Sequence, residues 1–378
     1  MNNNKELKER IGIDRSVLCD FTILDIIQSK LEAATATNSK NQYSKLSYDN
    51  RSPIRLSNGK GIGKLIVKDK QIGKLTISFE KNNLNGQKFI RSNLEMTISS
   101  NGNNLQNLNA EEYRTRIRDI FELLENTYGI IVDYSTIKIK QIELNATFYL
   151  KEPYEKYQKA ILMIMRNVPP DRYSYNDDNN SVKYATWHEA NLAANKNKLE
   201  TALVKNNSIE LKIYNKGKHL QDIGERDSLE RDIMRIEYKI KDKRTLKRAF
   251  WDDLVTSLTD DKITRLYKQY FDRDVVLRYE QWTESNQKQL LEVVQQHKQQ
   301  KQKWVGDFFR YCREYEAVNG LPLLFDVKDM LPILKILEPT NKNIYKKFKR
   351  LKQKAVYESD LIGNTIRMKE IINKIATM

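Results

Sequence analysis

The pattern of apolar and polar positions predicts where the strands and helices lie. Residues 137–148 alternate apolar and polar side chains and are rich in β-branched residues, which is typical of a strand. Residues 209–214 and 234–240 alternate in the same way. Residues 111–128 repeat apolar side chains at helical spacing and stop at Gly129, which predicts a core-facing helix. Together they predict an α+β fold, an antiparallel sheet with helices on one face.

The segments around this core differ in character. Residues 1–60 combine a short helical pattern at residues 22–27 with a polar, loop-like stretch at residues 37–58. Residues 64–79 alternate like a β-hairpin, and residues 152–166 resume a helical pattern. The sequence thus predicts three regions. They are an N-terminal helix and polar loop at residues 1–60, a central α+β domain at residues 60–285, and a small all-α basic domain for DNA binding or dimerisation at residues 286–378.

The predicted C-terminal domain is helical and basic. Residues 286–304 carry seven glutamines and a thin apolar stripe, which predicts an exposed connecting helix and a domain boundary near residue 285. Helix-turn-helix DNA binding is one arrangement that fits the helices beyond it. The last helical pattern is amphipathic, with one apolar side that consists of Ile344, Phe348, Leu351 and Ala355.

Net charge narrows the choice of partners. The chain has 66 Lys or Arg against 50 Asp or Glu, a formal net charge of +16, which favours a polyanion as partner. The surplus is concentrated at residues 341–378, which hold ten Lys or Arg and three acidic residues. A basic surface without a specific function is the alternative.

Cysteine usage and hydropathy predict a cytoplasmic protein. Cys19 and Cys312 are far apart, so they form neither a disulfide framework nor a CxxC zinc motif, and a reducing compartment is expected. No apolar run approaches the ~20 residues that span a bilayer, so no membrane partner is expected. Gly59, Gly61 and Gly63 look like a phosphate loop, but no Lys-Ser/Thr pair follows, so no nucleotide cofactor is expected.

Strand alternation also gathers ionisable side chains on the strand faces away from the apolar positions. If these three polar faces coincide in the sheet, a tyrosine, carboxylates and cations come together. The polar positions are Gln141, Glu143, Asn145 and Thr147 in the first strand, Glu210, Lys212 and Tyr214 in the second, and Arg235, Glu237 and Lys239 in the third.

Tyr214 is the candidate nucleophile for attack on a DNA phosphate. A phenol has a reference pKa near 10, so it needs neighbouring cations or a base to become nucleophilic at neutral pH. Lys212, Lys216, Lys218 and Arg235 are the candidate cations, and they would also bind phosphate. Tyrosines before this segment would stack on single-stranded DNA, or would simply pack in the core.

Two carboxylates are candidate metal ligands. Glu143 and Glu237 suit Mg²⁺ or Mn²⁺, because hard cations prefer carboxylate oxygens and phosphodiester attack develops negative charge. Cross-strand pairing of each glutamate with a lysine is an equal alternative. His219 is a third ligand or proton shuttle in one interpretation and a surface-loop histidine in the other.

Three sequence blocks occur in a particular order. They are Ile139–Phe148, Ile209–Lys216, and Met234–Lys239 with Arg244–Lys247 close behind, and Ser100–Leu105 and Thr186–Trp187 accompany them. This order resembles the rolling-circle replication initiators, and is most similar to the filamentous-phage gene II and plasmid replication-initiator group. The resemblance covers roughly residues 60–255, about half of the chain, and its most specific part is the tyrosine block with the Arg-x-Glu block.

The resemblance implies a rolling-circle nickase-like fold and an origin-specific enzyme that nicks and rejoins one DNA strand. Tyr214 would become linked to the 5′ phosphate and leave a 3′ hydroxyl as primer, with Glu143 and Glu237 as metal ligands. The implied partners are single-stranded and double-stranded origin DNA, a host helicase and DNA polymerase, with a homodimer as a further option. The paired-histidine metal motif of many members is absent, which favours a carboxylate metal site, because the histidines are His188, His219 and His297.

Two other functions stay open. A conjugative relaxase built on the same nicking domain would perform the same chemistry at a transfer origin. A non-catalytic DNA-binding repressor would need only the basic C-terminal segment, and Tyr214 would then be an ordinary strand tyrosine.

Overall fold

The computed structural model divides the chain into two compact units. The first comprises residues 1–149 and 205–267, and the second comprises residues 150–204 and 268–378. The residues that the structure describes are 7–27, 29–30, 33, 45–48, 54–55, 61–69, 73–80, 89–97, 107–167, 201–205, 208–222, 231–241, 243–250, 252, 254–299, 310, 314, 317, 330–357 and 359–378.

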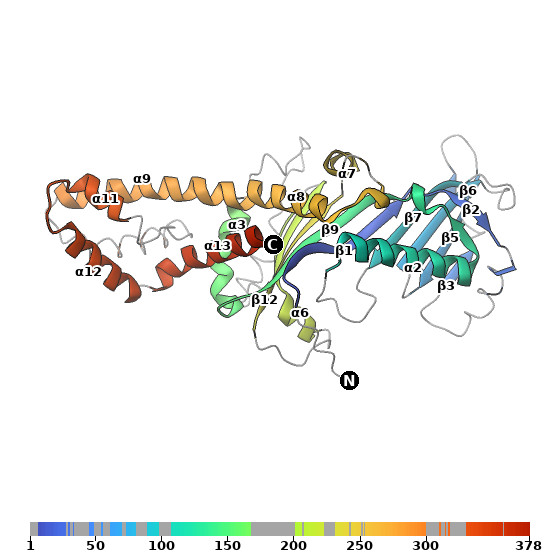
Figure 1. The fold of residues 1–378 in the computed structure, drawn as a ribbon, viewed down its shortest axis with the longest axis horizontal. Helices are drawn as coiled ribbons and strands as arrows, with labels where there is room; N and C mark the ends of the chain where they lie inside the picture. Colours follow the sequence, from blue (N-terminus) through green and yellow to red (C-terminus); the bar gives the residue numbers. More distant parts are fainter. Residues whose placement is uncertain are drawn as a thin grey trace. The chain divides into compact units, whose positions relative to one another are not determined.

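The first unit is built on a large antiparallel sheet (Figure 1). Within it the strand order is β11-β12-β9-β1-β7-β6-β5-β3, and β4 pairs with β5. A separate antiparallel pair joins β2 and β8, and β10 (Thr201–Lys205) precedes β11 in the sequence. The strands are β1 (Arg10–Cys19), β2 (Ile23–Ile26), β3 (Lys45–Tyr48), β4 (Ile54–Arg55), β5 (Gly61–Asp69), β6 (Gly73–Glu80), β7 (Phe89–Thr97), β8 (Ile130–Val132), β9 (Lys138–Tyr149), β11 (Ile209–Asn215) and β12 (Ile233–Ile240).

The strands predicted from alternation are present. The segments predicted at residues 137–148, 209–214 and 234–240 form β9, β11 and β12, and the predicted hairpin at residues 64–79 is β5 and β6 in antiparallel register. A mixed fold of helices and antiparallel sheet is therefore confirmed.

The N-terminal segment differs from the prediction. The helical pattern at residues 22–27 is wrong, because Ile23–Ile26 forms β2 and pairs with β8. The preceding β1 lies between β7 and β9 in the sheet, and β3 and β4 fall inside the stretch predicted as loop. The spacing of apolar residues within a short segment could not show the place of β1 in the sheet, since its partner strands lie far along the chain. Gly12 in β1 permits a close approach, because a Cβ there would lie 2.7 Å from the carbonyl oxygen of Leu108.

Helix α2 (Ala110–Tyr128) follows the predicted limits. It begins with a capping box, in which the Asn109 side chain accepts from the backbone N–H of Glu112 and the Glu112 carboxylate accepts from the backbone N–H of Asn109. It ends at Gly129, whose φ of 67° lies in the left-handed region that glycine adopts without strain. The buried Tyr113 hydroxyl donates to Ser16 Oγ of β1 at 2.7 Å, which ties the helix to the sheet.

Two helices pack on the same apolar face of this sheet. Ser16, which holds α2, lies directly opposite Ile142 in the register of β1 and β9. Tyr267 of α8 (Asp260–Phe271) makes an edge-to-face contact with Tyr238, with ring centroids 5.4 Å apart. Tyr238 in turn lies opposite Leu144. The other helical segments of this unit are α6 (Lys216–Asp222), α7 (Lys243–Phe250), η2 (Tyr134–Thr136) and η4 (Val255–Ser257).

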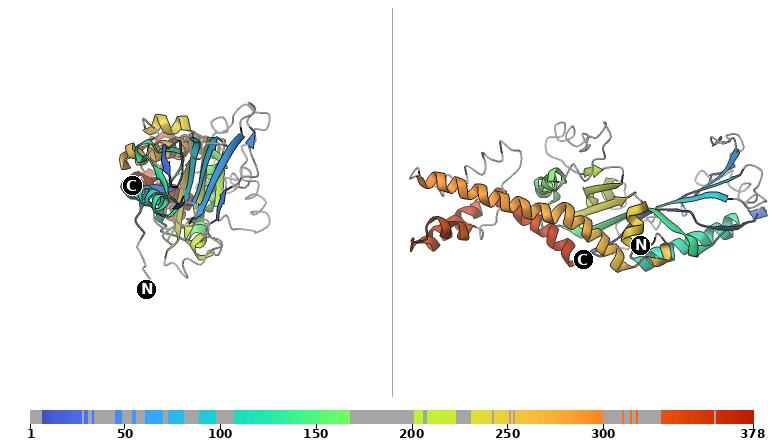
Figure 2. Two further views of the ribbon diagram at one scale, coloured as in Figure 1. Left: turned by 90° about the vertical axis from the view of Figure 1, so that its right-hand side faces the viewer. Right: turned by 90° about the horizontal axis from the view of Figure 1, so that it is seen from above.

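The second unit contains most of the remaining helices (Figure 2). Helix α9 runs without a break through residue 285, so the predicted boundary falls inside a helix. The Tyr157 hydroxyl donates to Glu370 Oε2 at 2.7 Å, and Arg367 Nε pairs with Glu152 at 2.6 Å. The helical elements are η3 (Tyr154–Tyr157), α3 (Gln158–Asn167), the π-helical η5 (Asp272–Val276), α9 (Leu277–Gln299), α11 (Met330–Leu337), α12 (Ile344–Tyr357) and α13 (Ser359–Thr377).

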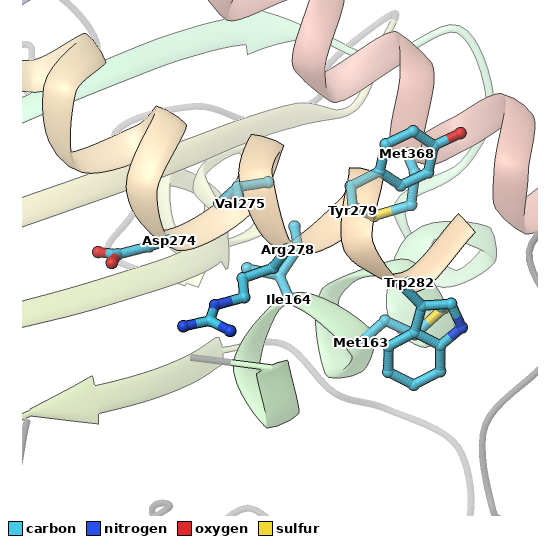
Figure 3. A pocket seen from close by; sticks show the side chains of 8 residues that line it. All are labelled: Met163, Ile164, Asp274, Val275, Arg278, Tyr279, Trp282 and Met368. Atoms are coloured by element: carbon cyan, nitrogen blue, oxygen red, sulfur yellow. The ribbon is translucent and has the colours of Figure 1, made fainter. Parts of the chain in front are cut away.

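A small cavity lies among α3, η5, α9 and α13 of the second unit (Figure 3). Its volume of about 10 Å³ is room for a single water molecule, not for a substrate. The buried Asp274 on its wall is paired with Arg273, with 2.5 Å between Nε and Oδ1. The cavity is lined by Met163, Ile164, Asp274, Val275, Arg278, Tyr279, Trp282 and Met368.

Within the described part of the chain, no helix is long and apolar enough to cross a membrane. Several features of the sequence lie outside the described residues and have no structural account. They are Gly59, Ser100–Leu105, Thr186–Trp187, His188 and Cys312.

Candidate functional site

The register of three strands brings their polar positions to one face of the sheet. Directly opposite residues in antiparallel strands project on the same side. Arg235 of β12 lies opposite both Tyr214 of β11 and Thr147 of β9. Glu237, two positions on, lies opposite both Lys212 and Asn145. The prediction that the three polar faces coincide is therefore confirmed.

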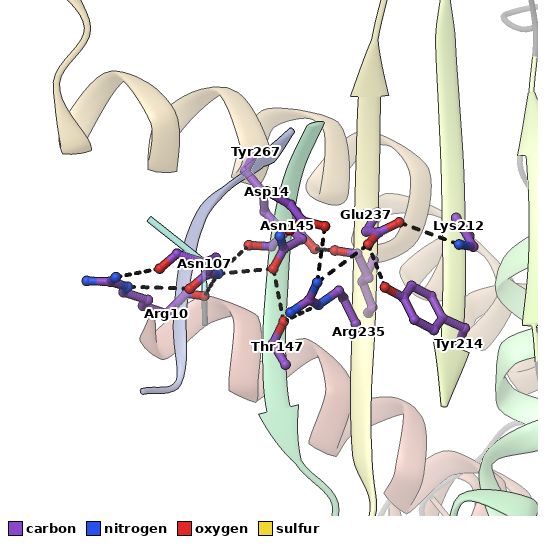
Figure 4. A network of polar contacts seen from close by, with 11 residues as sticks. Arg10, Asp14, Asn107, Asn145, Thr147, Lys212, Tyr214, Arg235, Glu237 and Tyr267 are labelled. Carbon is purple, nitrogen blue, oxygen red and sulfur yellow. Dashed lines mark hydrogen bonds and ion pairs between the residues drawn. The ribbon is translucent and has the colours of Figure 1, made fainter. Parts of the chain in front are cut away.

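Tyr214 lies on this face beside Glu237 and Lys212 (Figure 4). Its hydroxyl donates a hydrogen bond of 2.7 Å to Glu237 Oε1, and the residue is 5% exposed. Lys212 Nζ lies 4.2 Å from the centre of the Tyr214 ring and 3.9 Å from Glu237 Oε2. Lys216 Nζ lies 5.9 Å from the same ring, and the His219 ring meets it edge-on with centroids 6.0 Å apart. The predicted tyrosine, carboxylate and cations are thus neighbours.

The protonation state of this pair differs from the expectation for a cation-activated phenol. Burial raises the pKa of Tyr214 well above its usual value; Arg235 opposes this rise, and the negative charge of Glu237 adds to it. Burial also raises the pKa of Glu237, although Arg235 opposes it. The cations therefore do not ionise the phenol in advance. Burial keeps the phenol protonated, and its hydroxyl donates to Glu237.

Arg235 is fully buried beneath the pair. Its Nε donates to Thr147 Oγ1 at 2.7 Å, and its Nη1 lies 3.2 Å from Asp14 Oδ2 and 3.8 Å from Glu237 Oε1. Burial lowers the pKa of Arg235, but the neighbouring Tyr214, Asp14 and Glu237 outweigh this and raise it overall. The guanidinium is therefore a fixed positive charge between two carboxylates.

A hydrogen-bond network continues from Arg235 across the sheet (Figure 4). The Thr147 hydroxyl donates to Asn145 Oδ1 at 2.9 Å, and Asn107 Nδ2 donates to the same oxygen at 3.0 Å. Asn107 also accepts from Arg10, whose Nη2 lies 2.5 Å from the Asn107 carbonyl oxygen. The network thus links β11, β12, β9 and β1 with Asn107, which lies before α2.

Asn145 contributes a donor that is not satisfied within the described part of the chain. Because its Oδ1 accepts two hydrogen bonds, the amide orientation is fixed and Nδ2 must point elsewhere. That nitrogen is buried and has no partner among the described residues. Leaving a buried donor unsatisfied costs about 1–3 kcal/mol, a cost that proteins retain chiefly at functional sites.

Glu143 shares the face but not the contact with Tyr214. It lies opposite Lys239, and its Oε1 accepts from Lys239 Nζ at 2.7 Å, which is the cross-strand pair weighed as the alternative. Among the residues that the structure describes, no group of three or more His, Cys, Asp or Glu is placed to hold a metal ion. The carboxylates nearest to each other at the site are those of Asp14 and Glu237, which flank one nitrogen of Arg235.

Helix α6 supplies the remaining predicted residues. The Asn215 side chain accepts from the backbone N–H of Lys218 at 3.0 Å and caps the helix, so α6 begins directly after β11. Lys216 is buried, Lys218 is half-buried and His219 is exposed. Partial burial lowers the pKa of His219, and Lys216, Lys212 and Arg235 lower it further, so its imidazole is neutral at neutral pH.

Asp14 is the site residue that sequence reasoning missed. It was overlooked because residues 1–60 were assigned to a helix and loop, so no strand face was considered there. The usable signal was the strand-like run of β1, in which the apolar residues Ile11 and Ile13 are buried and flank Gly12. Asp14 is 221 positions from Arg235, so only the sheet brings them together.

No family model matches this chain, and no curated protein shows significant similarity to it.

Proposed function

We propose that this protein is a rolling-circle DNA replication initiator that nicks one strand at its origin through Tyr214. The observation that carries the proposal is the buried hydrogen bond of 2.7 Å between the Tyr214 hydroxyl and Glu237 Oε1, surrounded by Lys212, Lys216 and Arg235. A nucleophile in contact with a base that a third group orients is the arrangement that covalent catalysis needs.

In the proposed reaction Glu237 is the general base. The Tyr214 oxygen attacks the phosphorus, and the phenolic proton moves to the Glu237 carboxylate. The bond to the 3′ oxygen breaks, and this oxygen leaves as a 3′ hydroxyl after protonation from solvent. The 5′ phosphate stays on the tyrosine, and attack by a 3′ hydroxyl on this link rejoins the strand without a nucleotide cofactor. The raised pKa of Glu237 brings it closer to neutral pH, which makes it a better base.

The cations divide into two groups in this proposal. Arg235 is 0% exposed, so it positions Glu237 and stabilises its charge but does not reach DNA in this arrangement. Asp14 and Thr147 hold the guanidinium in place. Lys212 and Lys218 are only half-buried, so they are the cations that meet phosphate oxygens as the strand enters. Because Tyr214 is 5% exposed, entry requires Lys212 to move from above its ring.

A divalent cation, Mg²⁺ or Mn²⁺, belongs to the proposal. The donor chemistry fits in part, since Asp14 and Glu237 offer carboxylate oxygens that flank Arg235, whereas Glu143 is held by Lys239 and would have to leave it to become a ligand. When bound, the ion would neutralise charge on the phosphoryl oxygens. Each carboxylate now faces a side-chain cation, so metal binding must compete with Lys212, Lys239 or Arg235.

The finer assignments of fold and partners belong to the same proposal. The sheet would be a rolling-circle nickase-like domain, and the helices of residues 286–378 an all-α domain for duplex origin binding or dimerisation. Single-stranded and double-stranded origin DNA, a host helicase and DNA polymerase would be its partners in the cytoplasm. A conjugative relaxase would use the same site in the same way, and only the DNA it cuts would separate the two.

A non-catalytic DNA-binding repressor is the second candidate. The observation that favours it is the burial of Tyr214, whose hydroxyl donates to Glu237 inside the protein. In that case the pair would serve only to hold β11 and β12 together.

The test is formation of a covalent protein–DNA adduct. Purified protein is incubated with Mg²⁺ or Mn²⁺ and single-stranded oligonucleotides tiled across the replicon that encodes it, and a denaturing gel resolves the products. We expect an adduct that disappears in Tyr214→Phe, since the phenylalanine ring keeps the packing and lacks the nucleophile. Tyr149→Phe, at a half-buried tyrosine of the same sheet, is the matched control and should keep the adduct.

If no oligonucleotide gives an adduct while the protein still binds DNA, the nickase is contradicted and the repressor is supported. If the adduct persists in Tyr214→Phe, the assignment of Tyr214 is contradicted and the nucleophile is another residue. Thermal unfolding of Tyr214→Phe shows whether the fold survives the loss of the hydroxyl and of its bond to Glu237.

A further inference from the structure

Helices α11 and α12 form a compact pair within the second unit. The turn between them is fixed by Glu338, whose carboxylate accepts from Lys347 Nζ at 2.6 and 2.8 Å and from the Asn341 amide. Leu334 of α11 and Ile344 and Leu351 of α12 are buried. The pair is thus held by an apolar contact on one side and by a capped, ion-paired turn.

The opposite side of α12 is covered with cations. Ile344 and Leu351 are seven positions apart and mark one edge of the helix. At 100° per residue, the exposed positions occupy the arc across from that edge, and all of them are basic or uncharged. We call the cations of this arc the α12 basic face; they are Lys346, Lys349, Arg350 and Lys352.

The charge of this region is almost entirely of one sign. Residues 330–357 contain eight Lys or Arg and a single acidic residue, Glu338. That carboxylate is already neutralised by Lys347. Within the described part of the chain, the cations of the α12 basic face form no ion pair, so their field extends into solvent. A partner that recognises an exposed helix of uniform positive charge must therefore be a polyanion.

The exposed chemistry selects among polyanions. A membrane surface would need apolar side chains that insert beside the lysines, but Ile344 and Leu351 are turned into the protein. Single-stranded nucleic acid would need a row of aromatic platforms. Among the residues of α12 whose burial is described, Tyr345 is the one exposed aromatic ring; it is 61% exposed, with Lys335 Nζ 5.9 Å from its centre. The regularly spaced phosphates of a duplex need only cations for binding, and the α12 basic face supplies them.

We propose that the α12 basic face is a docking surface for the phosphate backbone of duplex DNA. The helix has 14 residues and is about 21 Å long, and the diameter of an α-helix matches the width of the major groove. Its contacts are charge-based and independent of base sequence, so it holds the duplex while another part of the protein selects the site. The inference rests on the proposed function only in that both take DNA as the partner.

The test compares two charge-neutralised variants of the full chain. Lys349→Gln/Arg350→Gln removes two cations of the α12 basic face. Lys288→Gln/Arg310→Gln removes two exposed cations of the same unit that lie outside it. Affinity for a short duplex of unrelated sequence is measured by fluorescence anisotropy between 50 and 200 mM salt. Each lost phosphate contact reduces the slope of log K against log salt by about 0.9.

We expect the α12 variant to bind duplex on the order of tenfold more weakly at about 150 mM salt, with a slope smaller by about 2. The control variant should stay within about twofold of the parent. A charge-preserving variant, Lys349→Arg/Arg350→Lys, should retain duplex affinity, which separates loss of charge from loss of folding. Equal binding by the parent and the α12 variant would overturn the inference, and so would loss of binding to phosphatidylserine vesicles without loss of duplex binding.

The outcome is independent of the nickase test. If Tyr214 forms no adduct but the α12 variant loses duplex affinity, the proposed enzyme fails and the docking surface stands. If the adduct forms on short single-stranded oligonucleotides and duplex affinity does not depend on α12, the docking surface alone is wrong.

Discussion

The polar face around Tyr214 and the α12 basic face both concentrate cations, but their counter-charges differ. In the sheet, Arg235 is fully buried and lies within 3.8 Å of two carboxylates. On α12 the cations are exposed, and the one nearby carboxylate, Glu338, is held by Lys347.

The difference separates two uses of charge. A buried charge must be paired, because removing it from water without compensation is unfavourable, and pairing fixes its geometry. An exposed charge is flexible and screened, so it contributes long-range attraction to a polyanion and little to folding. We therefore expect substitutions in the sheet to change stability and chemistry, and substitutions on α12 to change affinity alone.

Removal of the buried charge should have the largest effect. Arg235→Met leaves Asp14 and Glu237 buried without their common partner, and we expect a loss of about 3–5 kcal/mol in the free energy of unfolding. Urea denaturation monitored by circular dichroism measures it. A loss below about 1 kcal/mol would mean that the guanidinium does not hold this face together.

Loss of the base should come next. Glu237→Gln keeps the size of the side chain, and we expect adduct formation to slow on the order of 100-fold. Burial raises the pKa of Glu237, so the carboxylate that accepts the proton forms only as pH rises through a value above the usual ~4.3. The single-turnover rate of the parent should rise with pH through that step, and the variant should lack the step. An unchanged pH profile would exclude Glu237 as the base.

The same shift has a consequence for stability with a definite sign. A carboxyl whose pKa is raised on folding binds its proton more tightly in the folded state, so ionisation destabilises the protein as pH increases through that pKa. Glu237→Gln should abolish this part of the pH dependence of unfolding. Measuring the free energy of unfolding of the parent and of Glu237→Gln over the same pH range isolates the contribution of this carboxyl.

A smaller effect is expected at Thr147. Thr147→Val keeps the shape but removes the hydroxyl that accepts from Arg235 and donates to Asn145. We expect about 1–3 kcal/mol of destabilisation, since a buried donor of Arg235 loses its partner. Thr115→Val, at an exposed threonine of α2 outside this network, is a comparison for the substitution itself. Equal effects at both positions would indicate that the network adds nothing.

The smallest effect on folding is expected on α12. Lys349→Met removes an exposed cation, and we expect the free energy of unfolding to change by less than about 0.5 kcal/mol. Its duplex affinity should nevertheless become less dependent on salt, by about 0.9 in slope. If stability falls instead, the cation has a structural role and the contrast with Arg235 weakens.

Part of the candidate site could be read from the sequence. Alternation in β11 and β12 assigned Tyr214, Arg235 and Glu237 to polar strand faces, because side chains alternate with a period of two whatever the strand pairs with. Alternation in β9 likewise assigned Glu143 to such a face, but its pairing with Lys239 could not be foreseen, since that depends on register.

Other features needed the assembled sheet. The central position of β1 was missed because its partners lie far along the chain, as where Arg10 lies opposite Thr147, and a helical pattern was assigned to the segment that forms β2. The direction of the Tyr214 pKa shift also needed the structure, because burial raises the pKa of this phenol although Arg235 lowers it.

The sequence by itself determined the elements with strong local periodicity. Helix α2 with its Asn109 and Gly129 caps, the alternating strands and the basic, one-sided α12 all follow from interactions within a few residues. Tertiary structure alone decided which strands are neighbours, that Asp14 meets Arg235 across 221 positions, and that the Tyr214 hydroxyl donates to Glu237. Those outcomes depend on register and burial, which the whole chain sets together.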